Sequence, residues 1–174
     1  GEKGYTPVER VGARPTLDVN GLLSGFTGEG SKTVIPAWAM AKISMRLVPD
    51  QDPKEVKTQL EQYLAEHCPD GIRWELKSMA GGKASMSDPH HPGAQALARA
   101  LETVWGIRPV FKREGGSIPV VGDMQEILGV DSVLTGFGLP DDNIHSPNEK
   151  LHLPTWNKGI EALIHTLFNY VALE

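Results

Sequence analysis

The alternation of apolar and polar residues is clearest between Ala37 and Leu47. Apolar side chains recur there at every second position, while Lys42 and Arg46 are among the residues that fill the positions between them. Because successive side chains of a strand point to opposite faces of a sheet, this period of two predicts a half-buried strand with one polar face. The strand is expected to end at Pro49.

The rest of the first half is expected to hold two more strands and one helix. A looser alternation from Leu17 to Phe26, bounded by glycines, predicts a strand, and residues 72–79 predict another short one. Residues 52–55 read Asp-Pro-Lys-Glu, which supplies an N-cap, a proline at the first helical position and a capping-box acid. That helix is expected to stop near residues 69–71. Residues 1–16 are polar and hold two prolines, so we expect an irregular lead-in before an antiparallel sheet.

Helical and strand patterns alternate in the second half. Apolar stripes with helical spacing run through Ala94–Trp105, Val120–Leu128 and Trp156–Val171, and short apolar runs typical of strands occupy Val110–Phe111 and Val130–Phe137. Such alternation predicts an α/β layered unit with parallel strand pairing. The fold class expected for the whole chain is therefore α/β, with an antiparallel first half.

Turn-forming residues gather at residues 80–84 and 88–92, and these clusters predict a hinge between the two halves. The composition, 40% hydrophobic and 22% charged, is that of a globular protein, and the net charge is −5. Scattered Lys and Arg with few aromatic residues do not support nucleic-acid binding. The sequence contains no apolar stretch of about 18 residues, so it predicts no membrane span. Cys68 is the single cysteine, which excludes a disulfide within the chain and fits a cytoplasmic location.

The first candidate site is the loop at residues 112–119, Lys-Arg-Glu-Gly-Gly-Ser-Ile-Pro, which follows a predicted strand. Ligands of α/β sheets gather at the carboxyl ends of strands. Gly116 and its glycine neighbour allow the backbone to approach a ligand closely, and Ser117 at a helix start offers a hydroxyl and free amides. This chemistry suits a carboxylate or a phosphate. A simple helix cap at Ser117 explains the same residues equally well.

The second candidate site is the loop at residues 139–150, which follows the predicted strand over 130–137. His145 lies there after two acidic residues, at a strand end, and is a candidate metal ligand. Glu149 could orient its imidazole as a supporting carboxylate, or could be a solvated acid at a helix entry. His90 and His91 are not expected to be a metal pair, because the side chains of adjacent residues rarely converge.

Two residues of the first half could bind a substrate. Arg46 lies on the polar face of the predicted strand, and an arginine held on a sheet can grip a carboxylate through two parallel hydrogen bonds. An exposed strand arginine is the simpler alternative. Thr33, which follows a glycine-rich loop, is similarly ambiguous. No local pattern supports a Ser-His-Asp triad, a phosphate-binding loop or a dinucleotide fingerprint.

Several segments together resemble one known family. Residues 14–17, 32–36 and 43–49 resemble the lid domain of carnosinase-like cytosolic dipeptidases, and residues 113–119 and 145–150 resemble two signature loops of their catalytic domain. These enzymes belong to the metallopeptidase family that includes aminoacylase, acetylornithine deacetylase and succinyl-diaminopimelate desuccinylase. The resemblance covers nearly the whole chain in order.

The resemblance implies an organisation and a chemistry. Residues 1–86 would be the later part of an α+β lid, which mediates homodimerisation, and residues 87–174 the C-terminal part of a layered α/β catalytic domain. The family's two metals, zinc or sometimes manganese, polarise the scissile carbonyl and activate a water. His145 matches a metal-binding histidine. Thr33, Arg46, Gly116 and Ser117 match positions that hold the substrate, which would be a small peptide or an N-acyl amino acid.

The family's other metal ligands and its general base are expected upstream of this chain, which opens without a methionine or a signal-peptide layout. A segment cut from a longer enzyme, inactive by itself, is therefore expected. The whole enzyme would hydrolyse a peptide bond next to a free carboxylate. A substrate-side histidine expected before Gly81 is replaced by Ala80, which leaves a dipeptide other than carnosine or an amino-acid amide open. The alternative is a non-catalytic dimerisation or binding module derived from such an enzyme.

Overall fold

The computed structural model describes residues 2–79, 81–114 and 118–172. The chain forms two compact units. The first unit comprises residues 1–85 and 113–123, and the second comprises residues 86–112 and 124–174. The return of residues 113–123 to the first unit was not predicted from the sequence.

The first unit opens with a helix, α1 (Pro7–Ala13), where an irregular lead-in over residues 1–16 was predicted. That prediction is wrong because the residues before the helix form a full capping box. The Thr6 backbone N–H donates to Glu9 Oε2 at 2.7 Å, and the Glu9 N–H donates to Thr6 Oγ1 at 3.3 Å. Pro7 then takes the first helical position, where its missing N–H costs nothing.

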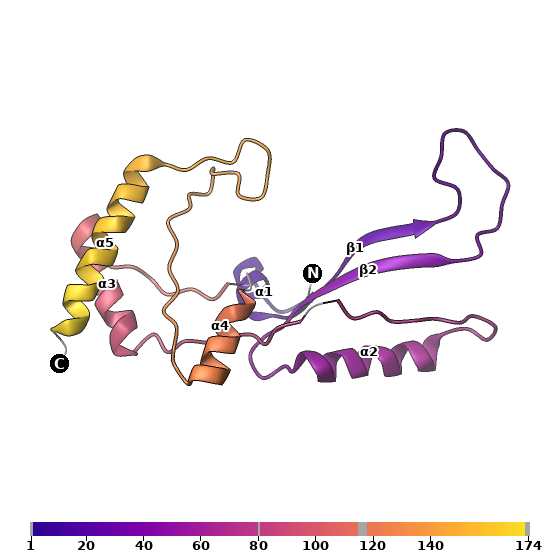
Figure 1. The fold of residues 1–174 in the computed structure, drawn as a ribbon, viewed down its shortest axis with the longest axis horizontal. Coiled ribbons are helices and arrows are strands. Elements are labelled where there is room, and N and C mark those ends of the chain that lie inside the picture. The colour runs from indigo at the N-terminus through magenta and orange to yellow at the C-terminus, as the bar shows by residue number, and fades with distance from the viewer. Residues whose placement is uncertain (1, 80, 115–117, 173–174) are drawn as a thin grey trace. The chain divides into compact units, whose positions relative to one another are not determined.

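Two of the predicted strands form an antiparallel hairpin, β1 (Thr16–Ser24) and β2 (Ala39–Arg46) (Figure 1). The pairing runs from Thr16 opposite Arg46 to Ser24 opposite Ala39. The register shifts between Val19 and Gly21, so Asn20 is a bulged residue. Its side chain crosses the hairpin, because Asn20 Nδ2 donates to Ser44 Oγ at 2.7 Å.

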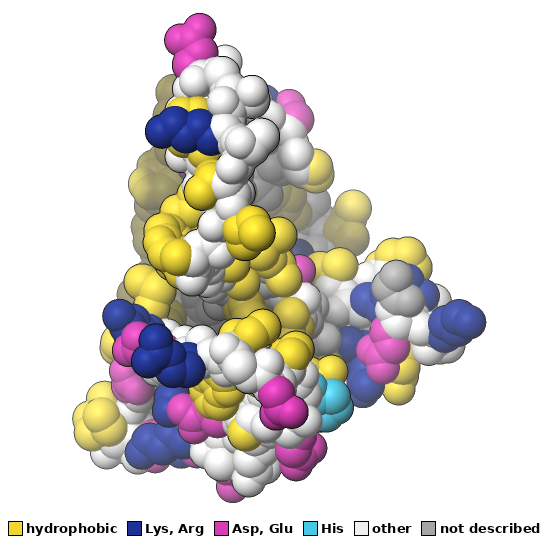
Figure 2. Space-filling model, turned by 90° about the vertical axis from the view of Figure 1, so that its right-hand side faces the viewer, with side chains coloured by type: hydrophobic (Ala, Val, Ile, Leu, Met, Phe, Trp, Pro, Cys, Tyr) yellow, Lys and Arg dark blue, Asp and Glu magenta, His cyan; other side chains and the backbone are white. Residues whose placement is uncertain are grey.

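The half-buried character predicted for the second of these strands is wrong. Every residue of β2 is exposed except Met45, which is half-buried. Among the described helices and strands none packs on either face of the hairpin, so most of its apolar side chains are exposed. Figure 2 faces the loop end of the hairpin and shows hydrophobic side chains at the surface there.

The helix predicted after residue 52 is confirmed as α2 (Pro53–His67). Asp52 is its N-cap, and Asp52 Oδ1 accepts from the Lys54 N–H at 2.7 Å. Residues 72–79, predicted as a short strand, do not form one. A strand exists only where a neighbour takes up its backbone hydrogen bonds, and in the described parts of the chain β1 and β2 are the sole pair.

The second unit is built on two helices that pack against each other, α3 (Pro92–Trp105) and α5 (Leu153–Val171) (Figure 1). Both were predicted. Small residues of the two helices are buried: Ala94, Ala96, Ala98, Ala100, Gly159 and Ala162. The Asn169 side chain also donates to the Ala96 carbonyl at 3.2 Å, which links the two helices directly.

The helix predicted at residues 120–128 forms as α4 (Pro119–Asp123), followed by a π-helical turn at Met124–Leu128. The strands predicted at 110–111 and 130–137 are absent, and so is the parallel pairing between them, within the residues that the structure describes. Their apolar runs lack partner strands. The fold is thus a mixture of helices with one small antiparallel sheet. No described helix is long and apolar enough to cross a membrane.

Candidate functional site

The loop that precedes α5 carries the candidate metal ligand His145. Three of its residues that are not glycine have left-handed backbones: Asn143 (φ 54°), His145 (φ 64°) and Asn148 (φ 61°). This conformation costs an L-residue roughly 1 kcal/mol, and asparagine and histidine are among the residues that adopt it most often. The His145 side chain is exposed. The loop therefore turns outward at His145 in a backbone conformation that the rest of the loop must sustain.

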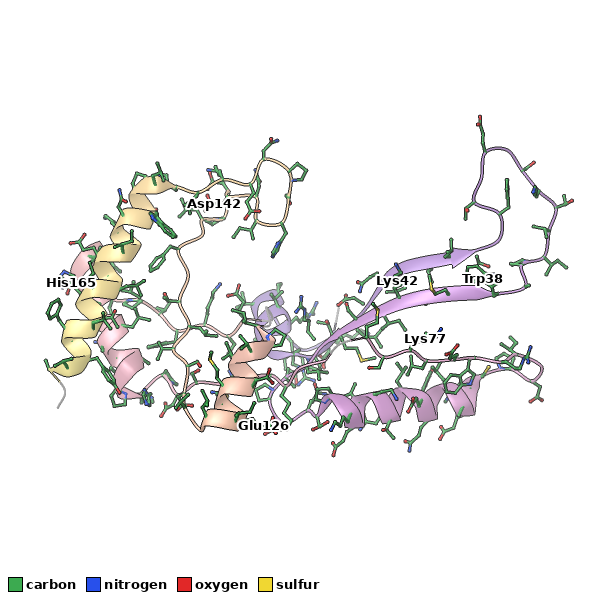
Figure 3. All side chains as sticks on the ribbon, viewed as in Figure 1. Trp38, Lys42, Lys77, Glu126, Asp142 and His165 are labelled. Carbon is green, nitrogen blue, oxygen red and sulfur yellow. The ribbon has the colours of Figure 1, made fainter. Side chains whose placement is uncertain are left out.

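Asp142 is the buried centre of this loop, with 2% of its surface exposed (Figure 3). Its Oδ2 accepts from the Leu139 backbone N–H at 2.7 Å, and its own N–H donates to the Leu139 carbonyl at 3.1 Å. The Asp142 carbonyl accepts from the Lys150 N–H at 3.0 Å. One residue therefore bonds to both ends of the loop.

Lys150 adds charge at the same point. Its Nζ lies 2.6 Å from Asp141 Oδ2 and 3.9 Å from Asp142 Oδ1. The hydrogen bond between the side chains of Asp141 and Lys150 lowers the pKa of Asp141 and raises the pKa of Lys150. Both of these groups are exposed, so solvent screens the pair and it contributes little to stability.

The loop also folds back on the residue that precedes it. A Cβ at Gly138 would lie 2.9 Å from Ile144 Cδ1, so a larger residue there would have to displace the end of the exposed Ile144 side chain. Glu149, the acid proposed to support His145, is exposed. The buried carboxylate of the loop is Asp142, a residue the sequence analysis did not single out. Asp142 lies in a turn two residues after Pro140, and Asp side chains in turns often bond to nearby backbone amides.

Arg46 and Thr33 both lie in the first unit and are exposed. Arg46 is the last residue of β2, and Thr33 belongs to the loop that joins the strands at the opposite end of the hairpin (Figure 1). A strand rises about 3.3 Å per residue, so the length of β2 places these ends more than about 20 Å apart. A dipeptide spans only about 7 Å. One copy of the hairpin therefore does not bring Arg46 and Thr33 to the same small substrate.

Gly116 and Ser117 lie outside the described residues. Described residues on both sides of them make close contacts within the first unit. A Cβ at Gly12 in α1 would lie 2.6 Å from the Arg113 carbonyl oxygen, and a Cβ at Gly82 would lie 3.1 Å from Pro119 Cβ. Glycine at both positions lets Arg113 approach α1 and Pro119 approach Gly82 within the first unit.

The described residues of this chain do not form a metal site by themselves. Over residues 2–79, 81–114 and 118–172, no three His, Cys, Asp or Glu side chains converge in a way that could hold an ion. His145 is therefore not part of such a group, and Oδ2 of the Asp142 carboxylate accepts from the Leu139 amide. Two other histidines serve helices instead: His91 Nδ1 accepts from the Gly93 N–H at 3.1 Å, and His152 caps α5.

Comparison with known proteins places the chain among the peptidases. A family model described as peptidase family M20/M25/M40 matches residues 2–169. The Cys-Gly metallodipeptidase DUG1 of Candida albicans is 37% identical over 154 residues, which are 86% of this chain and 31% of the relative. The Beta-Ala-His dipeptidase of Homo sapiens is 34% identical over 151 residues, 82% of this chain and 28% of the relative.

A solved structure gives the same picture. The M20 family metallo-carboxypeptidase Sso-CP2 of Sulfolobus solfataricus superimposes with a TM-score of 0.84 at 29% identity, over 97% of this chain and 39% of that protein. The chain thus spans about a third of the length of the relatives that it matches. The motifs, the fold and these similarities agree, and the chain belongs to peptidase family M20/M25/M40.

Proposed function

We propose that the complete protein is a metal-dependent dipeptidase that hydrolyses a peptide bond next to a free carboxylate. Membership in a metallopeptidase family implies divalent metal ions, and relatives are named as dipeptidases. The observation that carries the proposal is His145, an exposed imidazole on a left-handed backbone within the family's C-terminal loop motif. Strained residues of this kind gather at functional sites.

The residues of this chain would supply part of the site. His145 would be one ligand of a metal, zinc or manganese, whose other ligands come from elsewhere in the complete protein. Arg46 would hold the free carboxylate of the substrate through paired, charge-assisted hydrogen bonds. Gly116 and Ser117 would contact the substrate backbone. The general base would likewise come from elsewhere in the complete protein, and we expect the isolated chain to be inactive.

The position of Thr33 bears on assembly. Arg46 ends β2 and Thr33 belongs to the loop before β2 begins, so we infer that they serve one small substrate from different copies of the chain. This supports a homodimer through the first unit, with residues 1–86 as the lid and residues 87–174 as part of the catalytic domain. The substrate would be a small peptide or an N-acyl amino acid. We propose the cytoplasm as the location, in keeping with the single cysteine.

The metal assignment is tested by His145→Ala in the complete protein, with His90→Ala as the control. His90 is another exposed histidine of the second unit, in a turn before α3. We expect His145→Ala to lose bound metal and to lower kcat by about 100-fold or more, because the metal provides most of the chemistry. His90→Ala should retain both. Normal activity in the His145 variant would refute the assignment.

The carboxylate grip is tested by Arg46→Ala. Loss of two hydrogen bonds to a charged group should raise KM by about 10- to 100-fold, with a smaller effect on kcat. The same variant should handle a substrate with an amidated C-terminus as the wild type does. An equal loss on both substrates would show that Arg46 does not contact the carboxylate.

A second candidate is a non-catalytic dimerisation or binding module. The exposed apolar side chains of the hairpin favour it: Leu17, Val19, Leu22, Met40 and Ile43. The two candidates differ in metal content. A complete protein that binds no zinc or manganese and still dimerises would favour the module.

A further inference from the structure

Asp142 is a buried carboxylate in an exposed loop. Only 3% of its side chain is accessible, whereas the residues from 143 to 150 are all exposed. Removing a carboxylate from water is unfavourable unless hydrogen bonds or a cation compensate. Two groups do so here: the Leu139 amide at 2.7 Å from Oδ2, and the Lys150 ammonium at 3.9 Å from Oδ1. Among the described residues Oδ1 has no hydrogen-bond donor, so Lys150 balances the charge on that side.

These contacts tie together the two ends of the loop. Leu139 stands at its start and Lys150 at its end, and Asp142 bonds to the backbone of both. Between these ends the backbone is also bonded around His145, where the Ser146 N–H donates to the Asn143 carbonyl at 2.9 Å. The left-handed backbone of His145 is unfavourable by itself, so the closed ends must maintain it.

We propose that Asp142 is a positioning residue that fixes the loop ends and so sets the direction of the His145 imidazole. This inference rests on the proposed role of His145 as a metal ligand. Asp142 acts through the backbone at Leu139 and Lys150 and does not itself touch the metal or the substrate. Its effect should therefore appear in the affinity of the site for metal and in kcat, and not in KM.

Asp141 provides a matched control within the same loop. Asp141 carries the same charge as Asp142, and its Oδ2 lies nearer to Lys150 Nζ, at 2.6 Å. It is exposed, however, and the Leu139 amide donates to Asp142 instead. Replacement of Asp141 removes the closer partner of Lys150 and leaves the tie between the loop ends intact. The pair therefore separates the effect of loop charge from the effect of loop closure.

The experiment compares Asp142→Ala, Asp142→Asn and Asp141→Ala in the complete protein, with zinc affinity measured by chelator competition and amide exchange measured at Leu139 and Lys150. Asp142→Ala should weaken zinc binding and lower kcat by about 10- to 100-fold, as supporting groups of metal ligands do, and should speed exchange at both amides. Asp142→Asn keeps an oxygen for the Leu139 amide and should stay within about threefold of the wild type. Asp141→Ala should change zinc affinity and kcat by less than about threefold.

The outcomes are distinguishable from failure of the proposed function. If His145→Ala removes metal and activity while Asp142→Ala behaves as the wild type, the positioning role is wrong and the metal role stands. If His145→Ala retains both, the metal role falls and this inference falls with it. Asp142→Glu serves if the alanine variant does not fold, because it keeps the charge but displaces the carboxylate from the Leu139 amide. Wild-type zinc affinity in a folded Glu variant would overturn the proposal.

Discussion

Gly159 sits where α5 meets an aromatic ring, and its replacement by alanine sets two effects against each other. A Cβ there would lie 2.8, 2.9 and 3.0 Å from Cδ2, Cε2 and Cγ of Phe137. Carbon atoms in favourable contact are about 3.5–4.0 Å apart, so the ring must retreat by more than about half an ångström. The ring is also stacked on Trp105, with 5.9 Å between centroids and 4° between planes. A retreat would therefore disturb that pair as well.

The magnitude follows from the two opposing terms. Replacing Gly159 by alanine inside a helix gains about 1 kcal/mol in helix propensity. Forcing extra volume into a packed site costs about 1–3 kcal/mol, and the aromatic pair contributes about 0.5–1.5 kcal/mol more that could be lost in part. We expect the packing cost to win, with a net loss of about 1 kcal/mol in the free energy of unfolding.

Urea unfolding followed by tryptophan fluorescence measures this difference. Gly136→Ala is the control, because a Cβ at Gly136 meets nothing within 4 Å; it should stabilise slightly, by about 0.4–1 kcal/mol. In a Phe137→Ala background the clash is removed, and Gly159→Ala should then be stabilising. If Gly159→Ala stabilises the otherwise unaltered chain by about 1 kcal/mol, the close contact with Phe137 does not exist and the reasoning fails.

Three further predictions concern local features. Gly12→Ala should destabilise the first unit by about 1–3 kcal/mol in a thermal or urea unfolding series, because its Cβ would lie 2.6 Å from the Arg113 carbonyl oxygen. The hydrogen bond from Lys150 lowers the pKa of Asp141, so the stabilisation from this pair is complete above the ordinary Asp pKa and is lost as the pH falls through the lowered value. A carboxyl titration followed by NMR should show the lowered pKa of Asp141. If the Asp141 titration is the same in a Lys150→Met variant, Lys150 is not the cause. Thr6→Ala removes the cap of α1 and should cost about 0.5–2 kcal/mol, seen as faster amide exchange over residues 8–13; unchanged protection there would mean that the cap is not formed.

Helices with strong terminal signals could be predicted from the sequence because those signals act within a few residues. The acid, proline and apolar stripe after residue 51 gave α2 within its first turn. Equally local signals precede α1, where Thr6 and Glu9 form a capping box and Pro7 takes the first helical position, although the two prolines of residues 1–16 by themselves favour an irregular chain. The failure there was one of interpretation, because the information is local.

In the loop that carries His145, some features could be predicted from the sequence and others could not. The motif around His145 is visible in the sequence, and it identified the residue proposed as a ligand. Its left-handed backbone and the burial of Asp142 are properties of the closed loop, which depend on bonds between Leu139, Asp142 and Lys150. Glu149 and Asp142 are both acids near His145, and the sequence offered no reason to prefer the one that proved to be buried.

By itself the sequence determined the family, the two strands of the hairpin and the principal helices, because motifs, caps and periodicity are written in neighbouring residues. Tertiary structure decided which of the remaining apolar runs became strands. Residues 72–79 and 130–137 have strand-like patterns and form none, since a strand requires hydrogen bonds from a partner that may lie anywhere in a chain. It also decided the close approach of Phe137 to Gly159 and the burial of Asp142, because packing and desolvation depend on what surrounds a side chain and not on what precedes it.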